Sequence, residues 1–385
     1  MKKSILISMV FLFLLASCDK EDRIISPNLI INNPLLSATD SAVNHAFLKY
    51  QQDLNTVGVS IGLYKNGTAN FYGYGETKQG SGITPGKNTF FEIGSITKTF
   101  TSIVATNMLS EKGQTIETPI RPYLPNNLPT LAREGIEINF KHLMTHTSGL
   151  SYFPDNFGGS YYIGKIDEEF EKYDRNKMFT WLLNTPLRSK PFTTWEYSNG
   201  GMGLLGTLLE LNYGKDYGVI LKEKILIPLQ LNDTKTDMAE TDLSRWSTGY
   251  SNGKEVKYWN SLNSMNGAGV IKSTSADMIK YGLANLNPPN TPLGNAITQT
   301  QQVTFLPFTD AGRLKINGGL GWFQCIHKDL PNEIFIWHDG GTGGYSSDLF
   351  INQNKSSILV VLYNTAQGTQ AREDFMLELL KIISS

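Results

Sequence analysis

The chain has 385 residues, of which 40% are hydrophobic and 18% are charged, and its formal net charge at pH 7 is -1. This composition is typical of a globular protein with a substantial core and argues against a mainly disordered chain. A net charge so close to zero gives no electrostatic case for nucleic acid, so we expect no nucleic-acid partner.

The N-terminus has the features of a signal peptide. Lys2 and Lys3 precede residues 5–15, which are almost wholly apolar. That run is shorter than the roughly 20 residues that a membrane-spanning helix needs, but it suits the hydrophobic region of a signal peptide. Residues 15–18 (Leu-Ala-Ser-Cys) resemble a bacterial lipobox. An ordinary secretory signal with an incidental cysteine is the alternative.

We therefore expect residues 1–17 to be a lipoprotein signal peptide and Cys18 to carry the lipid. Residues 18–40 are polar, and we expect them to form a flexible tether to the membrane. The protein would then be a lipid-anchored lipoprotein of the cell envelope, on the periplasmic face or at the cell surface.

Residues 41–385 are expected to form one domain. Residues 57–75 alternate apolar and polar around Asn66-Gly67, which predicts a β-hairpin. Apolar side chains recur at helical spacing in residues 91–112, and Gly113 is a suitable C-cap. Near the C-terminus the pattern predicts four strands, at residues 316–326, 333–337, 346–351 and 356–363. A final helix is predicted after them, at residues 369–383.

Strands are thus expected at both ends of the chain, with helices between them. Residues 115–285 mix Pro- and Asn-rich loops with helical stretches such as 200–212. An α+β fold explains this order: one antiparallel sheet is built from both chain ends and flanked by helices, and a mainly helical region is inserted at about 115–285.

The first candidate catalytic motif is Ser95-Ile96-Thr97-Lys98. A serine hydroxyl is a poor nucleophile until a base takes its proton, and residues three apart on a helix share a face, so Lys98 can reach Ser95. The pattern occurs in β-lactamases and penicillin-binding proteins. Taken alone it is weak, because Ser251-Asn252-Gly253-Lys254 also matches it, in a stretch without helical periodicity.

The second motif is Tyr197-Ser198-Asn199, which precedes an apolar helix. A phenol beside a cationic lysine could be held partly ionised and relay a proton, and an asparagine amide can hold both Lys98 and a substrate carbonyl. Tyr258-Trp259-Asn260 has the same pattern but lies in an Asn- and Ser-rich loop, so we favour Tyr197.

The third motif, residues 338–344, begins at His338 and continues as Asp-Gly-Gly-Thr-Gly-Gly after an apolar run. A strand that ends in glycines, here Gly340 and Gly341, lets a substrate backbone lie against it. A backbone N–H there can pair with that of Ser95 as an oxyanion hole. A glycine-rich hairpin with a solvent-facing histidine is the competing interpretation.

In this order and spacing the three motifs resemble the serine β-lactamase, DD-peptidase and esterase superfamily, most closely the class C β-lactamase and S12 peptidase group. Further resemblances run from about residue 45 to residue 385 and include residues 142–150, 228–231 and 269–274. One departure is His338, because class C β-lactamases usually have lysine there. Members with His-x-Gly include DD-carboxypeptidases and D-amino-acid peptidases.

The resemblance implies an acyl-enzyme mechanism without metal or cofactor. Ser95 would attack a carbonyl, and Lys98 and Tyr197 would share the proton transfers. The substrate-binding groups would be Asn199, which orients Lys98 and the substrate amide, His338, which binds a substrate carboxylate or steers the tyrosine proton, and Gly340 and Gly341, whose strand and amides hold the substrate and its oxyanion.

Two other features are more readily explained by structure than by chemistry. His142 and His146 are four residues apart, but the glutamate of a zinc motif is missing, so we expect no metal site and assign them to hydrogen bonds that shape a loop. Cys325 lies in a strand-like run with no base nearby in the sequence, and we expect a buried thiol.

The leading hypothesis is therefore a monomeric serine hydrolase that cleaves amide bonds of D-amino-acid peptides or β-lactams. An esterase on small acyl esters, a penicillin-binding sensor that acylates without turnover, and a catalytically idle lipoprotein remain alternatives. The expected partners are a small-molecule or peptide substrate and, through the lipid anchor, the membrane.

Overall fold

The computed structural model describes residues 30–158, 166–302 and 305–385. The expected signal peptide and the lipidation site at Cys18 lie outside the described residues. Among the described residues, no helix is both long and apolar enough to cross a membrane.

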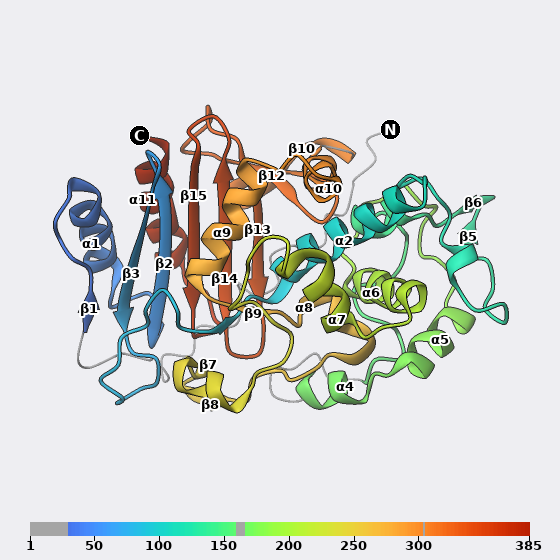
Figure 1. Ribbon diagram of the computed structural model, residues 1–385, viewed down its shortest axis with the longest axis horizontal. Helices are drawn as coiled ribbons and strands as arrows, with labels where there is room; N and C mark the ends of the chain where they lie inside the picture. Colours follow the sequence, from blue (N-terminus) through green and yellow to red (C-terminus); the bar gives the residue numbers. More distant parts are fainter. Residues whose placement is uncertain (1–29, 159–165, 303–304) are drawn as a thin grey trace.

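A nine-stranded antiparallel sheet forms one side of the molecule (Figure 1). Strand β2 from the N-terminal part pairs with β15, the last strand of the chain, so the sheet is built from both chain ends as expected. The spatial order is β1 (Ile31–Asn32), β3 (Thr68–Gly75), β2 (Gly58–Lys65), β15 (Ser357–Tyr363), β14 (Ser346–Asn352), β13 (Phe335–Gly341), β12 (Phe323–His327), β11 (Leu314–Gly318) and β10 (Phe305–Ala311).

Helices cover both faces of the sheet. Helices α1 (Ala38–Tyr50) and α11 (Gln370–Ser384) pack together on one face, and α9 (Ser275–Leu286) packs on the other, against β15 and β2. Strand β15 shows the result: Leu359 and Val361 belong to the first of these cores, whereas Val360 and Leu362 belong to the second. Burial on both faces explains why this strand is a continuous apolar run.

The second side of the molecule is mainly helical (Figure 1). Its helices are α3 (Phe140–Met144), α4 (Ile166–Lys172), α5 (Arg175–Asn184), α6 (Asn199–Tyr213), α7 (Tyr217–Leu221) and α8 (Asn266–Gly269). Helices α2 (Thr97–Glu111) and α10 (Pro292–Thr300) pack against each other. The expected upper boundary of the insertion, residue 285, is too late, since α9 begins at Ser275 and lies on the sheet.

Short strand pairs complete the fold. They are β4 (Phe91–Glu92) with β9 (Lys272–Ser273), β5 (Ala132–Arg133) with β6 (Ile136–Glu137), and β7 (Gly249–Ser251) with β8 (Lys254–Val256). The β7–β8 pair holds the second Ser-x-x-Lys match, so Ser251 and Lys254 face each other across a two-residue hairpin instead of sharing a helix.

Three elements differ from the sequence expectation. The single strand expected over residues 316–326 is wrong, because the chain turns back after Gly318 and forms two antiparallel strands, β11 and β12. The tether to residue 40 is wrong at its end, because Ile31 and Asn32 pair with β3 and the Ser37 side chain caps α1. The helix expected over residues 91–112 begins only at Thr97, after β4 and a 3₁₀ turn over Gly94–Ile96. The hairpin around Asn66-Gly67, α6 and α11 are confirmed.

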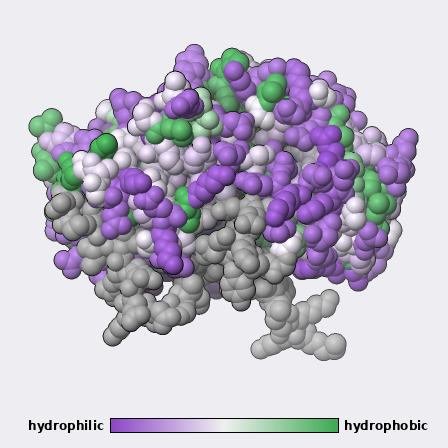
Figure 2. Space-filling model, turned by 90° about the horizontal axis from the view of Figure 1, so that it is seen from below, coloured by the Kyte–Doolittle hydropathy of each residue, from purple (hydrophilic) through white to green (hydrophobic). Residues whose placement is uncertain are grey.

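The face of the molecule shown in Figure 2 is mostly hydrophilic among its coloured residues, with hydrophobic side chains in small groups. The large apolar side chains are instead concentrated in the two cores that flank the sheet and fill the helical region.

Candidate active site

Ser95 lies at the junction between the sheet and the helical region, in the 3₁₀ turn that leads into α2. Ser95 is partly exposed to solvent, whereas all the remaining residues from 91 to 100 are buried. The turn therefore exposes the Ser95 hydroxyl to solvent, while the rest of the segment is buried. It also places that hydroxyl at the N-terminal end of α2, where the helix dipole favours negative charge.

Lys98 comes from the first turn of α2 and reaches back to Ser95, as expected. Its Nζ donates to Ser95 Oγ at 2.8 Å and to the main-chain oxygen of Ala268, in α8, at 2.7 Å. Lys98 is fully buried, and this burial lowers the pKa of its ammonium to about 7, although the nearby Asp339 carboxylate acts in the opposite direction. At neutral pH a large fraction of Lys98 is thus free to accept a proton.

Helix α2 is fixed by hydrogen bonds from its buried threonines. Thr101 Oγ1 donates to the main-chain oxygen of Gly267 at 2.7 Å, next to the Ala268 carbonyl that holds Lys98. Thr99 Oγ1 is bonded to the Tyr281 hydroxyl of α9 at 2.7 Å. Helix α2 is therefore tied both to the helical region and to α9, which packs on the sheet. Ala268 is a site residue that no sequence motif indicated.

Tyr197 stands immediately before α6, and its ring lies against Lys98, with Nζ 5.0 Å from the ring centroid. Its hydroxyl is hydrogen-bonded to Ser95. The expectation of a partly ionised phenol is wrong: burial raises the pKa of Tyr197 well above 10, and the Ser95 hydrogen bond offsets this only in part. The phenol is therefore a proton donor at neutral pH, since desolvation outweighs the hydrogen bond to Ser95.

Asn199 is the first residue of α6 and is 8% exposed, close to Tyr197 in the chain. Its main-chain N–H donates to the oxygen of Tyr152 at 2.8 Å. Within the described residues the ammonium of Lys98 is held by Ser95 and the Ala268 carbonyl, so the expected hydrogen bond from Asn199 is not formed. The expected role of Asn199 toward the substrate amide stays a prediction. The amide of Asn199 stays near the site without bonding Lys98.

Gly340 and Gly341 bring β13 against the turn that carries Ser95. A Cβ at Gly340 would lie 2.0 Å from the main-chain oxygen of Ile93, so only glycine fits there. Ser347 Oγ of β14 donates to the same oxygen at 3.0 Å. Gly94 has φ +49, and a Cβ on it would lie 2.7 Å from the Gly341 nitrogen. The Gly341 amide therefore lies beside the residue that precedes Ser95, as an oxyanion hole from Ser95 and Gly341 requires.

His338 is placed differently from the expectation. Its side chain is 0% exposed, packs against Phe323 and has its Nδ1 at 2.5 Å from the main-chain oxygen of Asp339. Burial and repulsion from Lys98 lower the pKa of the imidazole to about 3. A histidine that is neutral at physiological pH supplies no charge for a substrate carboxylate, and binding of a carboxylate by His338 stays a prediction. The neighbouring Asp339, whose side chain is 47% exposed, brings negative charge to this place instead.

The alternative candidates lie elsewhere. Ser251 Oγ accepts a hydrogen bond from Gln367 and Lys254 is exposed. Cys325 is fully buried, and burial raises the pKa of its thiol well above 9. His142 Nδ1 accepts the Asn139 N–H that caps α3, and in the part of the chain that the structure describes no group of three or more His, Cys, Asp and Glu side chains is arranged to hold a metal ion.

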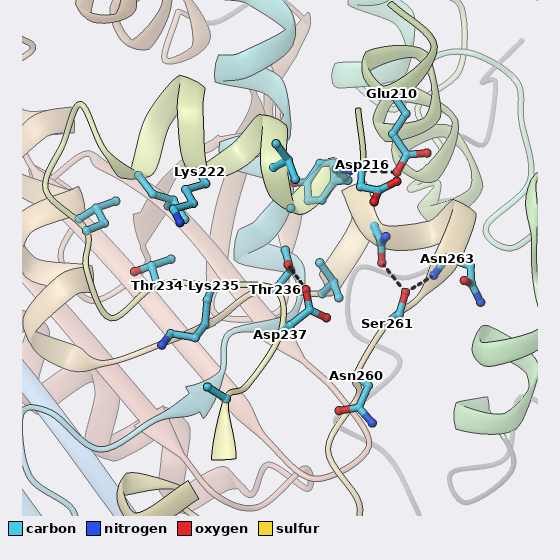
Figure 3. A pocket seen from close by; sticks show the side chains of 18 of the residues that line it. Glu210, Asp216, Lys222, Thr234, Lys235, Thr236, Asp237, Asn260, Ser261 and Asn263 are labelled. Atoms are coloured by element: carbon cyan, nitrogen blue, oxygen red, sulfur yellow. Dashed lines mark hydrogen bonds between the residues drawn. The ribbon is translucent and has the colours of Figure 1, made fainter. Parts of the chain in front are cut away.

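A cavity of about 860 Å³ lies in the helical region, away from the catalytic motifs (Figure 3). Charged and amide side chains line it, among them Lys222 and Asp237, together with Asn260 of the rival Tyr-x-Asn sequence. Asn266 at the start of α8 also lines it. Of the second Tyr-x-Asn sequence, Asn260 lines this cavity, whereas Tyr197 of the first lies beside Lys98.

The comparisons with known proteins agree with this geometry. The sequence model of the family described as Beta-lactamase matches residues 43–381. A beta-lactamase from Pseudomonas fluorescens is 29% identical over 283 residues, which cover 71% of this chain and 71% of that protein. The D-alanyl-D-alanine-carboxypeptidase/endopeptidase AmpH of Escherichia coli (strain K12) is 26% identical over 282 residues, again 71% of each chain.

Solved structures have the same fold. The crystal structure of a beta-lactamase/D-alanine carboxypeptidase from Yersinia pestis complexed with citrate superposes with a TM-score of 0.75 at 23% identity and covers 90% of this chain and 99% of that one. A class C beta lactamase from Rhodobacter sphaeroides gives a TM-score of 0.72 at 21% identity over 90% and 100% of the two chains. This chain belongs to the Beta-lactamase family and is a serine hydrolase.

Proposed function

We propose that the protein forms an acyl-enzyme on Ser95 and cleaves amide bonds of D-amino-acid peptides or β-lactams. The observation that carries this proposal is the contact between the partly exposed Ser95 Oγ and Lys98 Nζ at 2.8 Å. The pKa of Lys98, lowered to about 7 by burial, makes it a base suited to neutral pH.

The proposed steps use each group in the form that its surroundings favour. Neutral Lys98 takes the proton of Ser95 as Oγ attacks the substrate carbonyl, and the main-chain N–H groups of Ser95 and Gly341 stabilise the oxyanion. The protonated phenol of Tyr197 then gives its proton to the leaving nitrogen and is reprotonated from the Lys98 ammonium. Water hydrolyses the resulting ester and restores Ser95.

The named relatives support the substrate class, since they include beta-lactamases and a D-alanyl-D-alanine-carboxypeptidase/endopeptidase. One specific observation favours the second candidate, an esterase acting on neutral acyl esters. The buried, neutral His338 offers no cation to a substrate carboxylate, and the half-exposed Asp339 beside Lys98 repels one.

A comparison of substrates tests both candidates. Hydrolysis of a D-Ala-D-Ala peptide, a penicillin and an uncharged ester is measured with wild type and Asp339→Asn. The first proposal expects turnover of the peptide or the penicillin, increased by Asp339→Asn about three- to tenfold, because water screens the lost repulsion at this half-exposed position. Turnover of the ester alone, in both proteins, would overturn amide cleavage and establish the esterase. Acylation by penicillin without release would identify a penicillin-binding sensor.

A further inference from the structure

His146 connects the helical region to the segment that carries Tyr197. It follows α3, is 2% exposed, and packs its ring 4.3 Å from the Tyr197 ring at an interplanar angle of 31°. The two residues that flank Tyr197 both donate main-chain hydrogen bonds to His146. Glu196 N–H bonds the main-chain oxygen of His146 at 2.9 Å, and Ser198 N–H bonds its Nδ1 at 3.1 Å.

We propose that His146 is a positioning residue for Tyr197, because its imidazole and its carbonyl accept the two amides that flank the tyrosine and so hold the phenol next to Lys98 and Ser95. This inference rests on the proposed function, in which Tyr197 donates the proton. Ser198 connects the two parts directly, since its side chain also caps α6 by accepting the Gly201 N–H at 2.9 Å.

The hydrogen bond to Ser198 specifies the protonation of the imidazole. Nδ1 can accept only when it carries no proton, so the proton of the neutral ring is on Nε2. Burial, together with Lys98 and His338 nearby, lowers the pKa of His146 well below 6.5, so the acceptor persists through the neutral range. Within the described residues Nε2 has no hydrogen-bond partner, so the function of the ring lies at Nδ1 and in its packing.

The backbone of His146 adds an independent sign of constraint. Its φ is +57, in the left-handed region that non-glycine residues seldom adopt. This conformation lets the chain leave α3 so that the ring and the carbonyl both face residues 196–198. Asparagine tolerates the same conformation, and its Oδ1 occupies a position close to that of a histidine Nδ1. Glutamine places its amide further out, near the position of Nε2.

The matched pair His146→Asn and His146→Gln therefore separates the acceptor from the rest of the side chain. Three properties are measured: penicillin acylation between pH 5 and 9, hydrogen exchange of the Ser198 amide, and Tm. We expect His146→Gln to acylate about tenfold to a hundredfold more slowly at every pH, with an unchanged midpoint of the acid limb and faster exchange at Ser198. His146→Asn should stay within a few-fold of wild type in both rate and exchange.

Equal rates for wild type and His146→Gln, or equal losses in the two variants, would overturn the proposal. A shifted acid limb would do so too, because it would show that His146 acts on the charge of Lys98. If wild type is not acylated at all, the proposed function fails, and exchange at Ser198 still tests whether His146 holds this segment. If His146→Asn does not fold, the exchange measured on His146→Gln decides, and unaltered protection there contradicts the inference.

Discussion

Lys98 Nζ lies 2.8 Å from Ser95 Oγ while its side chain is fully buried under the Tyr197 ring. Removal from water lowers the pKa of the lysine to about 7, although the nearby Asp339 acts in the opposite direction. The same burial raises the pKa of Tyr197 well above 10. One environment thus produces a base and an acid next to the serine, as acyl transfer near neutral pH requires.

The first prediction concerns the pH dependence of acylation. Below about pH 7 Lys98 is protonated and cannot accept the Ser95 proton, so the rate should fall about tenfold for each pH unit below the pKa and level off above it. The measurement is the acylation rate of an uncharged ester between pH 5 and 9. A rate that does not change between pH 5 and 8 would exclude Lys98 as the base.

The second prediction concerns stability. Because the folded-state pKa of Lys98 lies below its usual 10.5, the unfolded chain binds one more proton than the folded one between about pH 7 and 10.5, and stability from this group rises with pH there. Lys98→Met lacks this dependence. Its stability relative to wild type should therefore decrease by roughly 2–3 kcal/mol between pH 7 and pH 9.

Urea unfolding of both proteins at the two pH values measures this difference. A constant difference between Lys98→Met and wild type would show that Lys98 is charged in the folded protein at neutral pH. Lys98→Met should also fail to acylate, which separates loss of the base from loss of the fold.

The third prediction concerns Tyr197. Tyr197→Phe keeps the ring over Lys98 but removes the proton donor, so turnover should fall about a hundredfold to a thousandfold. Tm should change little, and the acid limb from Lys98 should remain. Tyr152→Phe is the matched control, because that ring lies 5.9 Å from Tyr197 and has no proposed proton transfer. Equal losses in the two variants would remove Tyr197 from the mechanism.

The sequence predicts which residues form this site better than it predicts the protonation states of their side chains. The site brings together Ser95, Lys98, Tyr197 and the glycines of β13, as expected. The spacing of Ser95 and Lys98 predicts their contact on a helix, and the glycines predict a close approach of the backbone. The hairpin at Asn66-Gly67 and the sheet built from both chain ends are predicted for the same reason.

The charge of a group depends on burial by distant segments, which local patterns do not show. The sequence alone gives no sign that His338 is buried, yet Phe323 and the surrounding chain cover it and keep it neutral. Ala268 holds Lys98 through a main-chain oxygen, which any residue type supplies, so no motif could reveal it. Residues 31–40 belong to the folded domain because Ile31 and Asn32 pair with β3. This is a long-range contact, which a local sequence pattern does not show.

The fourth prediction concerns the N-terminus, for which we propose lipidation at Cys18. Wild type expressed with its full N-terminus should partition into the membrane fraction and begin at a lipidated Cys18. Cys18→Ala should remain an uncleaved precursor or be released in soluble form, whereas Cys325→Ala is the control, since that thiol is buried in the domain. A mature wild-type protein that starts at another residue would contradict the lipobox.

The central claim is that Ser95 is the nucleophile, and intact-mass analysis during incubation with a penicillin tests it most directly. Wild type and Ser251→Ala should each gain the mass of one penicillin, located on Ser95 by peptide mapping, and the adduct should decay as it is hydrolysed. Ser95→Ala should gain nothing at any time. An adduct that persists in Ser95→Ala, or that maps to Ser251 in wild type, would contradict the account.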